Sequence, residues 1–186
     1  IKSNCLYIVG LLLVSGNIRL MEPSPVHLAA EMGKLDVLEI LDSAGFDLHK
    51  ADKLGSTPMM YAAKDNQSRE SGNVATFLAL RGGKRLCKVR NSDGSTCLHI
   101  AADNNNASFI EAVLTCIGSV QSIKEYVAMP NFDKQSALDI SEKKGKSHVE
   151  TSMLFHQFIT SGSAGQRSRA KHQSQAAPVD PARMMA

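Results

Sequence analysis

One seven-residue phrase recurs along this chain and constrains the fold more than any other feature. Its first copy reads SPVHLAA from Ser24, and later copies read TPMMYAA from Thr57, TCLHIAA from Thr96 and, in decayed form, SALDISE from Ser136. The successive starts lie 33, 39 and 40 residues apart. A phrase that returns after 33 residues, with longer steps that insertions explain, indicates an array of repeats rather than a single globular core.

Each copy contains start and stop signals for two consecutive helices, and they are clearest in the first copy. Ser24 is a favoured helix N-cap, and Pro25 suits the first helical position, where its missing N–H costs no hydrogen bond. Ala29 and Ala30 are small enough to let two helices approach closely, and Gly33 ends the first helix. A second apolar stripe at helical spacing then predicts the outer helix of the pair, with Val37, Leu38 and Leu41.

The longer steps indicate two insertions. Residues 67–73 are polar and contain Gly, which predicts a loop between the two helices of the second copy. The other insertion falls at 118–129, after the outer helix of the third copy. Because loop additions cost little where stacking is undisturbed, we interpret both as tolerated loops. The alternative is that one of them adds a partner contact on the convex or lateral side.

Composition is typical of closely packed helices in a reducing compartment. Of 186 residues, 43% are apolar, 5% are aromatic and none is Trp. The formal net charge of +3 is small and its basic excess lies after Gly165, which does not favour a nucleic-acid partner. The four cysteines form no CxxC and no zinc-like spacing with histidines. We therefore predict a cytoplasmic chain, with the nucleus as the alternative.

An apolar segment at residues 5–14 is far shorter than the roughly 20 residues that a membrane-spanning helix needs, so no span is predicted. With Lys2 before it, the segment also resembles a signal-peptide core. Its apolar residues, however, repeat the helical spacing of the later outer helices. We therefore interpret it as the outer helix of a partial repeat.

The extended motif resembles the ankyrin repeat. The pattern is Thr-Pro-Leu-His-x-Ala, preceded by Asp-x-x-Gly and followed by Gly and a Val-x-x-x-Leu stripe, and it covers about Ile8 to Ile159. It is strong in the first three copies and weak in the fourth. The departures are Met60 and Asp139 at the motif His, and Cys97 and Ala137 at the motif Pro. The resemblance implies an all-α ankyrin-repeat solenoid of stacked antiparallel helix pairs with projecting β-turn fingers.

On this resemblance the chain divides into an ankyrin-repeat domain at 1–160 and a tail at 161–186. The domain would comprise a partial repeat at 5–21 and repeats at about 22–51, 52–90, 91–130 and 131–160. Few large apolar residues occur in the tail, which we expect to be disordered. In the fourth repeat, Ser141 and Glu142 replace the alanine pair, and a polar face is what a terminal repeat needs.

The resemblance also implies a function. In this family the fingers and the exposed sides of the inner helices line a concave face that serves mostly to bind another protein. Matching each copy to the positions that flank the motif assigns these residues to the face: Glu31, Met32, Ala51, Lys53, Leu54, Ser56, Lys64, Asp65, Ser92, Asp93, Ser95, Asp103, Asn104, Phe132, Lys134 and Gln135. Among them, Met32, Leu54 and Phe132 are apolar and suited to anchor a partner.

The chemistry-bearing residues of the motif favour a structural role over catalysis. His27 and His99 occupy the same position in separate repeats, and each is expected to bond a finger to a helix start. Cys97 beside His99 suggests a Cys–His dyad, but a cysteine in the proline slot is interpreted as packing. The chain contains no Gly-rich phosphate loop, and 103–106 lacks the ligand spacing of a calcium loop. We predict no catalysis, metal, cofactor or small-molecule substrate.

Two other functional classes stay open. The chain could be the targeting or regulatory ankyrin segment of a larger enzyme or membrane protein. It could also be a basic module that contacts nucleic acid or acidic lipid through Lys84, Arg85, Lys88 and Arg90. The basic residues of the tail lack interleaved aromatic residues, and we interpret them as solvated rather than as a nucleic-acid or nuclear-targeting segment: Arg167, Arg169, Lys171 and His172.

The assigned register predicts that the alanine positions tolerate no larger side chain. Ala29→Leu or Ala62→Leu should lower the free energy of unfolding by about 1–3 kcal/mol, because added methylene groups overpack a close helix contact. Thermal or urea denaturation measures the change. Unchanged melting of both variants would show that the register is wrong.

Overall fold

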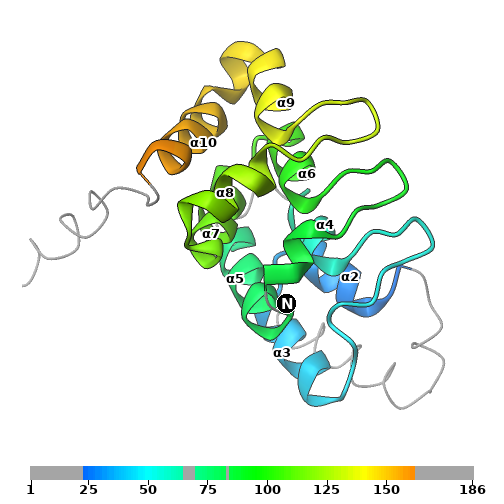
Figure 1. Ribbon diagram of the computed structural model, residues 1–186. Coiled ribbons are helices and arrows are strands. Elements are labelled where there is room, and N and C mark those ends of the chain that lie inside the picture. Colours follow the sequence, from blue (N-terminus) through cyan, green and yellow to red (C-terminus); the bar gives the residue numbers. More distant parts are fainter. Residues whose placement is uncertain (1–22, 65–69, 83, 162–186) are drawn as a thin grey trace, which may run out of the picture.

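The computed structural model describes residues 23–64, 70–82 and 84–161, and within these ranges the chain is helical and contains no strand. Helix pairs stack in one direction, from α2 and α3 at one end to α9 and α10 at the other (Figure 1). The predicted all-α solenoid is confirmed. The expected partial repeat at 5–21 lies outside the described residues, as does the expected tail except for Ser161, which is the last residue of α10.

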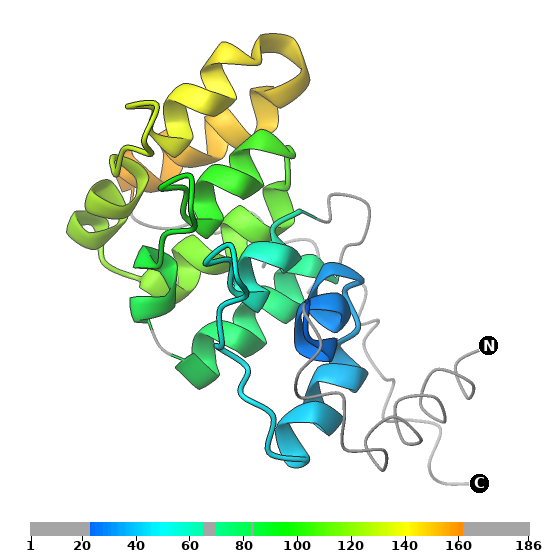
Figure 2. The same cartoon turned by 90° about the vertical axis from the view of Figure 1, so that its right-hand side faces the viewer.

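The helices form an inner and an outer layer (Figures 1 and 2). The inner layer consists of α2 (Pro25–Glu31), α4 (Pro58–Ala62), α6 (Cys97–Asp103) and α9 (Ala137–Lys143). The outer layer consists of α3 (Leu35–Ser43), α5 (Ser71–Gly82), α7 (Ala107–Ile117) and α10 (Val149–Ser161). Shorter elements between the pairs are η2 (Lys84–Lys88), α8 (Val120–Val127) and η3 (Gly145–His148). Fingers at 52–55, 91–94 and 131–134 project from the inner layer.

The core runs between the two layers and continues from repeat to repeat. Helix α2 packs on α4, α6 packs on α9, and α5 packs on α7. The alanine pairs of the first three repeats are buried, so the inner helices meet with little side-chain bulk between them. Leu38, Leu78 and Phe109 of the outer helices are fully buried. Burial of each such side chain contributes about 1.5–3 kcal/mol, and most of it depends on the neighbouring repeat.

A buried asparagine adds a polar connection between the second and third repeats. Asn106, at the N-cap of α7, accepts a hydrogen bond from the Phe109 amide at 3.0 Å and another from the Ser71 hydroxyl at 3.1 Å. Its side-chain amide donates to the carbonyls of Ala62 and Ala63, each at 3.4 Å. One side chain thus caps one helix and pairs with two others, which fixes the stacking of α7 on the repeat before it.

The insertion at 118–129 forms a helix, so the loop predicted there is wrong. Ser119 caps α8 by accepting a hydrogen bond from the Ser122 amide at 3.2 Å. The apolar side of α8 is buried at Ile123, Tyr126 and Val127, and the helix packs against α10. The other predicted loop is also too long, because α5 already begins at Ser71. Residues 65–69 of that connection lie outside the described residues.

Neighbouring fingers are joined by backbone hydrogen bonds. The Ser92 amide donates to the Leu54 carbonyl at 2.8 Å, and the Phe132 amide donates to the Asp93 carbonyl at 3.2 Å. Within each finger, the first side chain accepts bonds from amides of the same turn; they are Asp52, Asn91 and Asn131. The fingers are therefore held both internally and to one another.

One finger position shows how stacking selects the residue. Gly94 has φ +72°, and a Cβ atom there would lie 2.6 Å from the ring of Phe132 in the next finger. The corresponding residue of the third finger is Lys134, which keeps the left-handed conformation with φ +61°. In the part of the chain that the structure describes, no further finger packs on the third. A side chain is consequently accommodated there, at a backbone strain of about 1–2 kcal/mol.

The motif histidines connect each repeat to the next finger. The Nδ1 atom of His99 accepts bonds from the Thr96 amide at 3.1 Å and from the Thr96 hydroxyl at 2.8 Å. Because an amide can only donate, Nδ1 carries no proton, and Nε2–H donates to the Gln135 carbonyl at 3.1 Å. His27 makes the same three bonds, with Ser24 and with the Ser56 carbonyl. The expected finger-to-helix role of both histidines is confirmed.

The second repeat lacks this connection because Met60 stands at the histidine position. Met60 is fully buried, and the Thr57 hydroxyl oxygen is buried without a hydrogen-bond partner. In the fourth repeat, Asp139 replaces the histidine and keeps its two hydrogen bonds to the N-cap residue. Its Oδ2 accepts bonds from the Ser136 amide at 2.8 Å and from the Ser136 hydroxyl at 2.7 Å. These bonds lower the pKa of Asp139.

Within the described ranges, no helix is both long and apolar enough to span a bilayer.

The histidine connection predicts a pH-dependent stability. His99→Met should destabilise the fold by about 1–3 kcal/mol at pH 7.5, because the buried Thr96 hydroxyl loses its partner. Burial lowers the pKa of His99, only partly offset by its bonds to the Gln135 and Met129 backbones, and Arg90 lowers it further. The unfolded chain therefore binds protons first, so this stability is present above about pH 6.5 and is lost as the pH falls. Urea denaturation at several pH values should show the two proteins converging toward acid.

The second repeat supplies the complementary variant. Met60→His should raise the free energy of unfolding by about 0.5–1.5 kcal/mol at pH 7.5, because the ring would pair with Thr57 and with the Ser95 carbonyl. The gain should diminish below about pH 6.5 for the same reason as above. A Met60→His protein that is less stable than the wild type at pH 7.5 would contradict the connection as described.

Candidate protein-binding face

The fingers and the inner helices lie on one side of the stack (Figures 1 and 2). We use the name concave face for the surface made by the three described fingers and the exposed sides of α2, α4, α6 and α9. Its geometry follows from the repeat. Helices α4, α6 and α9 each begin directly after a finger, so the finger and the helix that follows it flank the same surface.

The three predicted apolar anchors are exposed on this face, as is Leu28 of α2 at 42%. Met32, Leu54 and Phe132 have exposed fractions of 58%, 63% and 71%. They come from the end of α2 and from the first and third fingers. Exposed apolar side chains on an otherwise polar surface are candidates for contact with a partner.

Most of the other predicted residues are also accessible to solvent. The exposed ones are Ala51, Lys53, Lys64, Ser92, Asp93, Asp103 and Lys134, and the half-buried ones are Glu31, Ser95, Asn104 and Gln135. Ser56 is a correction, since it is buried with 8% exposed and its carbonyl accepts the His27 bond. The position directly before the helix cap faces the histidine of the preceding repeat, which leaves no room for a partner. Asp65 lies outside the described residues.

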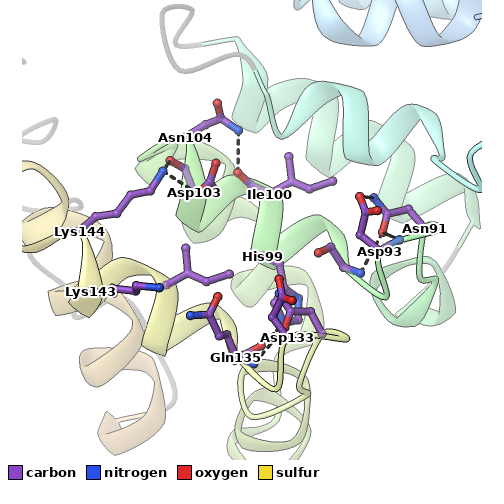
Figure 3. A pocket seen from close by; sticks show the side chains of 13 residues that line it. Asn91, Asp93, His99, Ile100, Asp103, Asn104, Asp133, Gln135, Lys143 and Lys144 are labelled. Carbon is purple, nitrogen blue, oxygen red and sulfur yellow. Dashed lines mark hydrogen bonds and ion pairs between the residues drawn. The ribbon is translucent and has the colours of Figure 1, made fainter.

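A pocket of about 470 Å³ lies between the second and third described fingers, above α6 and α9 (Figure 3). We call it the inter-repeat pocket. It brings together five of the predicted residues: Asp93, Ser95, Asp103, Asn104 and Gln135. The sequence analysis did not assign these lining residues to the face: Asn91, His99, Ile100, Asn131, Asp133, Ile140, Lys143 and Lys144.

The missed residues follow from the repeat phase. The residue after the motif histidine forms the floor of the face, and it is Leu28, Tyr61, Ile100 and Ile140 in successive repeats. Lys143 and Lys144 correspond to Glu31 and Met32 of the first repeat. Extending the same phase to the decayed fourth copy would have found them.

The floor of the second repeat is a polar cluster around Tyr61. The Tyr61 hydroxyl donates to Asp52 at 2.9 Å, and the Lys64 ammonium lies 4.0 Å from the centre of the ring. Burial, followed by the bond to Asp52, raises the pKa of Tyr61 to about 12. Burial alone would raise the pKa of Asp52, but bonds from the Ser56 amide, Tyr61 and the Leu54 amide lower it overall. Tyr61 is therefore neutral and Asp52 ionised near neutral pH, so the pair exchanges no proton.

Two cysteines, Cys87 of the second repeat and Cys97 of the third, are packed in the core. Cys87 and Cys97 are both fully buried. A hydrogen bond between the two thiols raises the pKa of Cys97, with burial adding to the effect, and the same bond lowers the pKa of Cys87. Cys97 is thus held as a thiol, and both ring nitrogens of His99 are engaged elsewhere. The suspected Cys97–His99 dyad is not formed. Among the described residues, no group of three metal-ligating side chains comes together.

The structure describes only part of the basic run Lys84, Arg85, Lys88 and Arg90 that follows α5. The side chains of Lys84 and Arg85 lie outside the described residues. The Lys88 ammonium lies 4.8 Å from the centre of the Tyr126 ring of α8, where it makes a cation–π contact.

Comparison with known proteins gives consistent results. The family model for ankyrin repeats in three copies matches residues 26–124. NF-kappa-B inhibitor alpha of Homo sapiens is 25% identical over 95 residues, which are 51% of this chain and 30% of that protein. The probable E3 ubiquitin-protein ligase XBOS31 of Oryza sativa subsp. japonica is 31% identical over 97 residues, which are 52% of this chain and 20% of that protein.

The aligned part therefore spans less than a third of either relative. Ankyrin repeats are generally protein–protein interaction modules and are typically non-catalytic. The repeated phrase, the stacked helix pairs with their hydrogen-bonded fingers, and the match over more than half of the chain lead to one conclusion: this chain belongs to the ankyrin-repeat family.

Proposed function

We propose that this chain is a non-catalytic scaffold that binds a partner protein on its concave face. The observation that carries the proposal is the exposure of the large apolar side chains Met32, Leu54 and Phe132 on that one face. Interfaces draw most of their binding energy from a few such anchors, which are surrounded by polar residues that contribute less. The other residues proposed for contact are Glu31, Lys53, Lys64, Ser92, Asp93, Ser95, Asp103, Asn104 and Lys134.

The mechanism is presentation of a pre-formed surface. The fingers are tied to one another by the bonds from Ser92 and Phe132, and to the preceding helices by His27 and His99. A surface that is already ordered loses little conformational entropy when it binds. Partner affinity should therefore depend on the side chains of the face more than on any rearrangement of the backbone.

The non-catalytic part of the proposal is supported by reactive side chains that are already engaged in structural hydrogen bonds. The motif histidines use both ring nitrogens in structural bonds, and Tyr61 and Asp52 hold each other in fixed protonation states. We propose neither cofactor, metal nor small-molecule substrate. Among the described residues, Cys87, Cys97 and Cys116 form no disulfide bond, which supports a reducing compartment, namely the cytoplasm or the nucleus.

A second candidate is that this chain is the targeting segment of a larger protein, such as an enzyme. The similarity to part of a probable ubiquitin ligase favours it, because the aligned residues make up only 20% of that relative. The concave face would then select the substrate for chemistry that takes place elsewhere. The complete reading frame decides between the candidates, since a catalytic or membrane-spanning domain beside the repeats would establish the second.

The proposal predicts that the three apolar anchors act together in partner binding. Replacing Met32, Leu54 and Phe132 by Ser at once should weaken capture of a partner by about a hundredfold or more, because each anchor contributes at least about 1 kcal/mol. Affinity is measured by calorimetry on a partner identified with the wild-type chain. Circular dichroism checks that the variant is folded.

A matched control uses three exposed apolar side chains of the outer layer. Leu80, Val149 and Met153 have exposed fractions of 77%, 50% and 65% and lie on α5 and α10. Replacing them by Ser removes a comparable apolar surface from the opposite side of the stack and should leave affinity unchanged. The proposed face is wrong if the control set weakens binding and the concave set does not.

A further inference from the structure

The inter-repeat pocket has the shape of a side-chain binding site. Its volume of about 470 Å³ is within the range of roughly 300–1,000 Å³ that is usual for ligand pockets. Ile100 and Ile140 line it from α6 and α9. The fingers 91–94 and 131–134 and the last turns of the two helices supply polar walls (Figure 3). An apolar lining beneath charged walls suits a long side chain with an aliphatic stem and a polar end.

The charges of the pocket are only partly compensated. Its walls carry Asp93, Asp103 and Asp133 together with Lys143 and Lys144. The Lys144 ammonium pairs with the Asp103 carboxylate at 2.6 Å and donates to the Asp103 carbonyl at 2.7 Å. Among the described residues, neither Asp93 nor Asp133 has a cationic partner. Two uncompensated carboxylates are therefore left on the finger walls.

The two fingers that carry these carboxylates are joined to each other by a backbone hydrogen bond. Asp93 and Asp133 occupy the same position in consecutive fingers, and those fingers are joined by the bond from the Phe132 amide to the Asp93 carbonyl. Like charges on neighbouring fingers repel each other, and the repulsion is relieved by a cation that reaches both. On the opposite side, Lys143 of α9 repels a cation (Figure 3). The pocket thus favours one orientation of a bound cationic group.

We propose that the partner of the concave face inserts a Lys or Arg side chain of an extended peptide segment into the inter-repeat pocket. The aliphatic stem lies on Ile100 and Ile140, and the cationic end pairs with Asp93 and Asp133. The Lys143 ammonium disfavours the reversed arrangement and so adds specificity. This inference rests on the proposed function, because it names the chemistry that the concave face selects.

The test uses the full chain and a random peptide library. Peptides are selected on the wild-type chain, sequenced, synthesised and measured by fluorescence anisotropy. Selected peptides should share a Lys or Arg residue. Its replacement by Gln should weaken binding about tenfold or more, as should the paired change Asp93→Asn and Asp133→Asn in the protein. Raised salt should weaken binding as well. A selection without a shared cationic residue, or without any enriched peptide, overturns the inference.

Two controls separate a local charge pair from a general effect of net charge. The paired change Glu39→Gln and Glu150→Gln also removes two negative charges, but from exposed positions of α3 and α10. It should leave the affinity for the peptide unchanged. Lys143→Gln removes a like charge from the pocket, so affinity should stay the same or rise. If the outer-layer pair weakens binding as much as the pocket pair, the inference is overturned.

The apolar anchors distinguish the two proposals. Peptides that lose affinity for the Met32, Leu54 and Phe132 serine variant, but bind the Asp93 and Asp133 variant normally, would leave the concave face as the binding face and overturn the pocket assignment. Peptides that bind both variants normally would overturn both proposals. Melting curves of each variant confirm that a loss of affinity does not come from unfolding.

Discussion

The structure depends on the close approach of consecutive inner helices. A repeat of this size cannot bury its apolar surface alone, and it becomes stable only when its neighbour covers it. The buried alanines at the ends of α2, α4 and α6 make that contact possible, because they add almost no side-chain bulk between helices. The spacing of the helices then sets the spacing of the fingers. At that spacing one finger amide reaches the carbonyl of the finger before it, as Ser92 reaches Leu54.

The repeated phrase was sufficient to predict this architecture because stacking acts through local residues. The N-cap, the alanine pair and the motif histidine each have their partner within one repeat or the next, so a short sequence pattern carries the contact. The helix α8 could not be read in the same way. It occurs once, and its stability comes from covering α10 with Ile123, Tyr126 and Val127, a contact that no repeated spacing records.

The sequence predicted where the face lies, but not which of its residues are buried. Repeat phase assigned Asp93 and Asp103 to the same face, and both line the inter-repeat pocket. It also placed Ser56 on the surface, where the bond from His27 to the Ser56 carbonyl in fact draws the residue into the interior. Whether a finger residue is exposed depends on the side chain that the preceding repeat directs toward it. This exposure depends on two neighbouring repeats, so it cannot be predicted from the position of a residue within one repeat.

The decayed fourth repeat ends the described part of the stack and also lines the inter-repeat pocket. It contributes Ile140 to the apolar lining of the pocket, and Lys143 lies on the side opposite Asp93 (Figure 3). Lys144 and the imidazole of His148 both donate to the Asp103 carbonyl, so the wall is fastened to the repeat below it. A mutation that loosened this attachment would alter the pocket without touching its carboxylates.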